Sequence, residues 1–217
     1  MFRSTTTLRL KTGFAFNHLR VAAQSAREAY RIETAGGASF GEWFDGMMRQ
    51  VPVSVVMAGA ALEANANEIL QDIIDGSSKI TISPPRKKLL AGLKEEHIGN
   101  ATSRCRRLAL LLDKDPDTGT EPWHNMSLLV RFRNEFMHFR PTMDDESVHS
   151  AGFVAELRRK IPVVESYEEQ FLFPHGFMTY GCAKWAVETV LTFSSDFADL
   201  LGVNDRFAVG SADFELP

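Results

Sequence analysis

The segment RNEFMH, residues 133–138, contains residue types that could act on a phosphodiester. An arginine side chain such as that of Arg133 binds phosphate through two parallel hydrogen bonds and stays charged. The imidazole of His138 titrates near neutrality, so it could serve as a general acid or a general base. Arg133, Asn134 and His138 are therefore the residues of this segment whose types could do chemistry.

Residues 122–139 have the helical spacing needed to position these side chains. At about 100° per residue, the large apolar residues fall on one stripe, which consists of Leu128, Leu129, Phe132, Phe136 and Phe139. Arg133, Asn134, Met137 and His138 fall on a second arc outside that stripe. Asn134 and His138 are one turn apart and can touch. The pattern predicts that the three polar residues share a face outside the core, with His138 in the last turn, where the helix dipole favours its cationic form.

The remaining expected elements are also helical. We expect helices at residues 14–33, 39–48, 52–75, 86–96, 102–112, 151–160 and 177–201. Ser39 and Glu42 have the spacing of a capping box, and Pro52 suits the first turn of a helix. Residues 58–61 are small, so a neighbouring helix can approach there closely. Residues 203–217 form a C-terminal tail in which 206–209 could be a strand or an arm. No strong series of strands is present, so the sequence predicts one all-α domain over residues 1–217.

The composition of the chain indicates which classes of protein it can belong to. The chain has 217 residues, of which 44% are hydrophobic and 24% charged, as in globular proteins. No stretch reaches about 18 apolar residues and the first residues lack an apolar core, so we expect neither a membrane span nor a signal peptide. Cys105 and Cys182 are too few for a disulfide framework and are interpreted as buried thiols of a cytoplasmic protein.

The distribution of charge is uneven. The net charge is −4, which argues against a DNA-coating protein, but residues 81–140 carry +4 and residues 141–217 carry −8. Basic clusters lie at residues 86–88, 104–107 and 158–160. Each could be only a solvated helix face. The alternative is a salt-sensitive contact with the RNA backbone, for which the candidates are Arg104, Arg106 and Arg107. Arg140, just past the predicted helix, could also contact RNA or could only bind the last carbonyls of that helix.

Other motifs do not support a site. The glycine-rich residues 36–41 lack the lysine of a phosphate loop and are interpreted as a turn. Residues 113–124 are similar to a calcium loop, but their glycine is misplaced and the twelfth position is His124 rather than glutamate. The histidines and cysteines lack the spacing of metal ligands. We therefore expect no metal site and no cofactor.

The segment 133–138 resembles the signature of the HEPN superfamily. That signature is an arginine, usually followed by Asn, Asp or His, and then a histidine after four to six intervening residues. Here four residues intervene and the first of them is Asn134. Residues 61–69, ALEANANEI, are similar to a helix that many members place before the motif helix. The resemblance spans residues 50–200, and it implies a HEPN-like antiparallel bundle with extra helices.

The resemblance also implies a function. Many members are metal-independent endoribonucleases of toxin–antitoxin or phage-defence systems, in which two protomers form one composite cleft. By this resemblance the chain is a homodimer that binds RNA, with Arg133 as the phosphate clamp and His138 as the acid or base. Asn134 would orient His138 or the phosphate, and Glu63 is a candidate for the same cleft. A cognate antitoxin or defence partner is a further candidate partner. Other members are non-catalytic adaptors, and an unrelated helical protein is a third alternative.

Overall fold

The computed structural model describes residues 12–36, 41–95, 100–139, 151–164 and 173–217, and its regular elements in these ranges are all helices. The prediction of an all-α protein is therefore confirmed. The α-helices are α1 (Ala15–Thr34), α2 (Glu42–Asp75), α3 (Pro84–Glu95), α4 (Ala101–Leu111), α5 (Glu121–Met137), α6 (Ala151–Lys160) and α7 (Tyr180–Leu201). Two 3₁₀-helices, η2 (His175–Phe177) and η3 (Ala208–Phe214), lie before and after α7.

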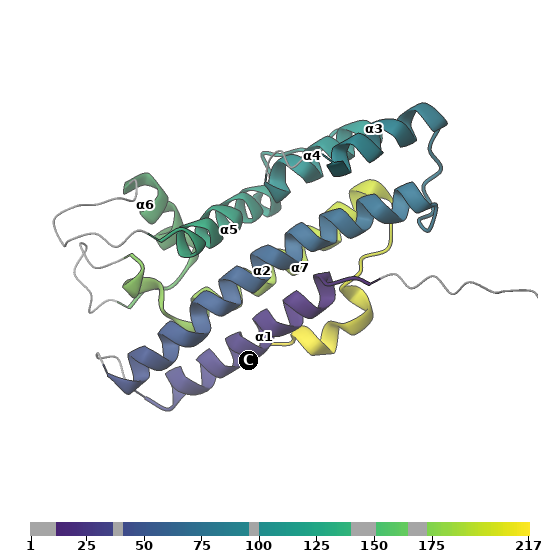
Figure 1. Cartoon of the computed structure of the whole chain (residues 1–217). Coiled ribbons are helices and arrows are strands. Elements are labelled where there is room, and N and C mark those ends of the chain that lie inside the picture. Colours follow the sequence, from purple (N-terminus) through teal and green to yellow (C-terminus); the bar gives the residue numbers. More distant parts are fainter. Residues whose placement is uncertain (1–11, 37–40, 96–99, 140–150, 165–172) are drawn as a thin grey trace, which may run out of the picture.

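Helix α2 is the centre of the molecule. It has 34 residues and is about 51 Å long, and α1 and α7 pack along it (Figure 1). Helix α1 turns a row of alanines toward this core, including the fully buried Ala22 and Ala26, so its backbone comes close to α2. Helix α5 packs against both α2 and α7, while α3 and α4 pack against α2. Helix α2 is therefore the element against which these other helices pack.

The sequence-based division of α2 into two helices is wrong. Pro52 lies inside one continuous helix instead of at the start of a second one. Proline cannot donate the hydrogen bond that the carbonyl of Met48 would accept, which normally disfavours this position. Val51 and Val55 on either side of it are fully buried, so tertiary packing holds the helix together here. Gly41 is the N-cap of α2, and Ser39 lies outside the described residues.

Two predicted features near the ends of helices also need correction. Helix α5 ends at Met137, so His138 is the C-cap residue and does not lie in the last turn. Phe139 lies beyond the helix and is 46% exposed, so it does not belong to the core stripe. Residues 206–209 form neither a strand nor an arm. The chain turns there into η3 because Phe207 and Phe214 are both buried, with the Phe214 ring 4.9 Å from that of Phe16.

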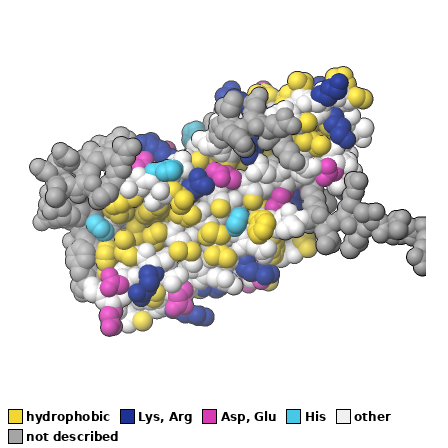
Figure 2. Space-filling model, viewed as in Figure 1, with side chains coloured by type: hydrophobic (Ala, Val, Ile, Leu, Met, Phe, Trp, Pro, Cys, Tyr) yellow, Lys and Arg dark blue, Asp and Glu magenta, His cyan; other side chains and the backbone are white. Residues whose placement is uncertain are grey.

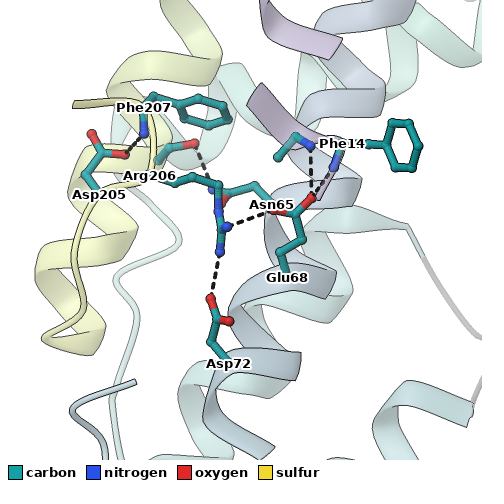
Figure 3. Close-up of polar contacts among 9 residues, drawn as sticks. Phe14, Asn65, Glu68, Asp72, Asp205, Arg206 and Phe207 are labelled. Carbon is teal, nitrogen blue, oxygen red and sulfur yellow. Dashed lines mark hydrogen bonds and ion pairs between the residues drawn. The ribbon is translucent and has the colours of Figure 1, made fainter. Parts of the chain in front are cut away.

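An ionic cluster fixes the C-terminal tail to α2 (Figure 3). Arg206 forms ion pairs of 2.8 Å with both Glu68 and Asp72. The other carboxylate oxygen of Glu68 accepts hydrogen bonds from the backbone N–H groups of Phe14, at 2.6 Å, and Ala15, at 2.9 Å. These amides begin α1 and have no partner inside the helix. Glu68 therefore connects α2, on which it lies, to the start of α1 and, through Arg206, to the C-terminal tail.

Candidate functional site

Arg133 lies between α5 and α2 and bridges the two helices. Its Nη2 donates a hydrogen bond to Glu63 Oε2 at 3.2 Å, and its Nη1 donates one to Asn134 Oδ1 at 2.9 Å. The side chain is only 22% exposed. Its Nε is buried and has no hydrogen-bond partner among the described residues. The guanidinium is therefore fixed at two of its nitrogens and retains an unused donor at the third.

Gly59 allows Arg133 to occupy this position. A Cβ atom at Gly59 would lie 2.9 Å from Arg133 Cγ, closer than such atoms come in real structures. The small residues 58–61 therefore allow a neighbouring helix to approach closely, as the sequence predicts. That helix is α5. Met126 and Val130 lie on the same side of α5 as Arg133 and are buried. The buried face of α5 thus extends beyond the predicted stripe, and the stem of Arg133 contacts α2 at Gly59.

His138 occupies a different environment. It is exposed, and its backbone N–H donates to the carbonyl of Asn134 at 2.9 Å. Its imidazole forms no hydrogen bond or ion pair with any described residue. The neighbouring Met137 and Phe139 are 54% and 46% exposed. The structure therefore brings Arg133, Asn134 and Glu63 together, and leaves His138 between two exposed hydrophobic residues at the end of the same helix.

One of the predicted basic residues lies along the same face of α2. Arg104 of α4 donates a hydrogen bond to the side chain of Asn67. Asn67 is one helical turn after Glu63 on α2, so the two side chains share a face. Arg106 and Arg107 are exposed on α4, and Arg140 lies outside the described residues. Helix α2 thus connects the Arg133 cluster to the basic helix α4. The sequence analysis did not predict this link, because Asn67 has no distinctive local signal.

The two cysteines are not poised as nucleophiles. Burial raises the pKa of Cys105 to about 12, and burial raises the pKa of Cys182 as well. Both thiols therefore stay protonated near neutral pH, whereas the thiolate is the reactive form. Among the described residues, no group of three or more His, Cys, Asp or Glu side chains could hold a metal ion. None of the described helices is both long and apolar enough to cross a membrane.

Comparisons of the chain with models of protein families, with curated proteins and with solved structures give no match. The function of the chain is therefore inferred from the chemistry and geometry of its own residues.

Proposed function

We propose that this protein is a metal-independent endoribonuclease of the toxin–antitoxin or phage-defence kind, as its resemblance to the HEPN superfamily implies. The observation that carries the proposal is the position of Arg133. Glu63 and Asn134 hold it at the junction of α2 and α5, and the exposed His138 follows at the end of the same helix. A fixed cation and a free imidazole are the two kinds of group that RNA cleavage requires.

The reaction has one bond-forming and one bond-breaking step at phosphorus. A general base removes the proton of the 2′-hydroxyl group, and O2′ attacks the adjacent phosphorus. The bond from phosphorus to the 5′-oxygen breaks, and a general acid protonates the departing oxygen. His138 performs one of these proton transfers, Arg133 stabilises the charge on the phosphorane, and Asn134 keeps the guanidinium in place. The products are a 2′,3′-cyclic phosphate and a 5′-hydroxyl end.

A second copy of the chain would supply the second proton-transfer group. Met137 and Phe139 on either side of His138 are both exposed, and large apolar side chains beside a polar group are typical of a surface that another chain covers. Hydrophobic side chains also gather over α1 and α2 on the face seen in Figure 2. A two-fold dimer is the commonest oligomer. It would place one His138 from each copy in a shared cleft.

Cleavage assays with single-stranded RNA test the proposal. We expect wild-type cleavage to continue in EDTA and to leave 2′,3′-cyclic phosphate ends, because the side chains and the substrate supply every reacting group. His138→Ala should reduce the rate by about 10²–10⁴-fold. Its free energy of unfolding should change by no more than about 1 kcal/mol, because the side chain is exposed.

His124→Ala is the matched control, because His124 is likewise an exposed histidine and lies near the other end of α5. This variant should cleave RNA at the wild-type rate. Full activity of His138→Ala, or loss of wild-type activity in EDTA, would contradict the mechanism.

A specific observation favours a second candidate function, that of a non-catalytic adaptor. The guanidinium of Arg133 is already neutralised by Glu63, and the Arg133 side chain is mostly buried, as in an ion pair that only stabilises a helix junction. In that case the exposed surface around His138 would bind a partner protein. A folded wild-type dimer that cleaves no RNA under any condition would support this alternative over the nuclease.

A further inference from the structure

Helices α3 and α4 form a hairpin at one end of the molecule (Figure 1). Arg86, in the first turn of α3, forms an ion pair of 2.5 Å with Asp113, which follows the end of α4. The start of α3 therefore lies beside the end of α4. These two helix ends and their side chains are the tip of the hairpin.

Two leucines at this tip are exposed. Leu89 is 58% exposed and Leu110 is 51% exposed, whereas the adjacent Leu90 is fully buried. Leu89 lies one turn after Arg86 on the same helix. Leu110 lies one turn before Asp113, whose backbone N–H donates to the Leu110 carbonyl at 3.1 Å. The ion pair between the two helices therefore has one exposed leucine on each side.

Exposed cations lie next to both leucines. On α4, Arg106 is exposed and lies one turn before Leu110, so the two side chains share the outward face of the helix. On α3, Lys88 is exposed and adjoins Leu89 in the sequence. The surface of the tip is therefore both apolar and basic.

The charge of the hairpin is opposite to that of the whole chain. Residues 84–112 contain seven Lys or Arg and two Glu, so they carry a net charge of +5, whereas the chain carries −4. The loop at residues 113–117 carries −2, and its Asp113 is paired with Arg86. Hydrophobic and basic side chains lie together at this end of the molecule, at the upper right of Figure 2. An anionic partner is therefore complementary to the hairpin in charge.

The exposed leucines distinguish between classes of anionic partner. The phosphate backbone of RNA attracts basic side chains but offers leucine no apolar contact. An anionic lipid bilayer offers both, because its surface attracts Lys and Arg and its acyl region accepts apolar side chains. A bilayer is also flat, so only a projecting part of a protein can reach it. The hairpin tip projects in this way at the upper right of Figure 1.

We propose that the tip of the α3–α4 hairpin binds the surface of an anionic phospholipid bilayer. Leu89 and Leu110 enter the boundary between headgroups and acyl chains, and Lys88 and Arg106 lie against the lipid phosphates. Binding is peripheral and reversible, because two leucines bury little apolar area. This surface is separate from Arg133 and does not depend on the proposed nuclease.

Co-sedimentation of the full chain with unilamellar vesicles tests the proposal. Vesicles of phosphatidylcholine and phosphatidylglycerol in equal parts should bind the protein. Vesicles of phosphatidylcholine alone should bind it at least about ten-fold more weakly, because they lack the negative surface charge. Salt at about 0.5 M should release most of the bound protein, because it screens the exposed charges.

The leucines are tested by the double variant Leu89→Gln and Leu110→Gln. It should bind the mixed vesicles about ten-fold more weakly than the wild type, because both side chains lose the gain from entering the acyl region. Val209→Gln is the matched control, because Val209 is 89% exposed on η3. This variant should bind like the wild type.

The cations are tested by the double variant Lys88→Gln and Arg106→Gln. Binding to the mixed vesicles should weaken by about ten-fold or more, because each basic residue at an anionic surface contributes about five-fold. Arg49→Gln with Arg159→Gln removes the same charge at exposed positions of α2 and α6. That control should change the affinity by no more than about two-fold.

The proposal is overturned if the wild type does not prefer the anionic vesicles, a result that would favour an acidic protein as the partner of this surface. It is also overturned if the leucine double variant binds as tightly as the wild type, because a polyanion such as RNA would then be sufficient. Equal losses in the two charge variants would overturn it as well. The first outcome is read from the wild-type protein, so the test does not depend on whether the variants fold.

Discussion

The guanidinium of Arg133 is held by a carboxylate on one side and an amide on the other. Glu63 Oε2 lies 3.2 Å from Nη2, and the Glu63 side chain is 37% exposed. Solvent therefore screens the pair, and ion pairs of this kind contribute about 0–1 kcal/mol. A phosphodiester offers two oxygens in the geometry that matches an arginine side chain. In the proposed nuclease, a phosphodiester of the RNA would displace Glu63 at small cost, so Glu63 would compete with RNA for Arg133.

Glu63→Gln should strengthen RNA binding. The glutamine keeps an oxygen that can accept from Nη2 but loses the charge that neutralises Arg133. We expect the affinity for a single-stranded RNA to rise by about five-fold, which corresponds to about 1 kcal/mol. Fluorescence anisotropy at low salt measures this change. Asp196→Asn, at an exposed position of α7, removes one negative charge elsewhere and controls for net charge. Equal effects of the two variants would show that Glu63 does not restrain Arg133.

At the scale of the elements, the site depends on how closely α5 approaches α2. Gly59 has no side chain, and the stem of Arg133 occupies the space that a side chain would fill. The same face of α2 then presents Glu63 and Asn67 at successive turns, where they meet Arg133 of α5 and Arg104 of α4. The packing of three helices thus aligns residues that are far apart in the sequence.

Gly59→Ala should disturb this junction. Its Cβ would lie 2.9 Å from Arg133 Cγ, so Arg133 or α5 must move. We expect unfolding free energy to fall by about 1–3 kcal/mol, as for other overpacked sites, and RNA binding to weaken. Gly92→Ala in α3 is the matched control, because nothing lies within 4 Å of its new Cβ. That variant should gain about 0.5–1 kcal/mol from helix propensity. Denaturant unfolding measures both, and equal gains in stability would exclude the close contact.

At the scale of the whole molecule, the start of α1 and the C-terminal tail meet on α2. Arg206, Glu68 and Asp72 form the partly buried cluster that joins them (Figure 3). A second link, between Arg20 of α1 and Asp213 of η3, is an ion pair of 2.9 Å on the exposed surface. Charges removed from water interact more strongly than exposed ones, so the two links should differ in strength.

Arg206→Ala should destabilise the protein more than Arg20→Ala. Loss of Arg206 removes the cation that lies between the neighbouring carboxylates of Glu68 and Asp72, and we expect a cost of about 1–3 kcal/mol. Arg20→Ala should cost no more than about 0.5 kcal/mol. Thermal and denaturant unfolding measure the difference. If both variants have the same free energy of unfolding, the Arg206 cluster contributes no more to stability than the exposed pair of Arg20 and Asp213.

The proposed dimer is also a property of the whole molecule. We expect light scattering at micromolar concentration to give the mass of two chains, and Met137→Glu to give the mass of one, because it introduces charge into the surface beside His138. Val209→Glu is the control, because Val209 is 89% exposed on η3 and should not contribute to that surface. A wild-type monomer would count strongly against a composite site.

The helical class and several local features of this protein follow from short-range patterns in its sequence. Apolar residues recur at helical spacing, so most helices could be located, and Gly76 and Gly202 end α2 and α7 in the left-handed conformation that glycine favours. The apolar stripe of α5 was found correctly for Leu128, Leu129 and Phe132. These features depend on residues only a few positions apart, so a local pattern contains them.

Other features of the fold and the site arise from contacts between helices that are distant in the sequence. Helix α2 continues through Pro52 because packing outweighs a local break, and the tail forms η3 because two phenylalanines are buried there. The pairing of Arg133 with Glu63 joins residues 70 positions apart. A helical wheel of α5 contains no information about α2, so it assigned Arg133 to a face outside the core, although α2 covers its stem. Contacts between distant segments depend on how the helices pack, and one segment alone does not encode that packing.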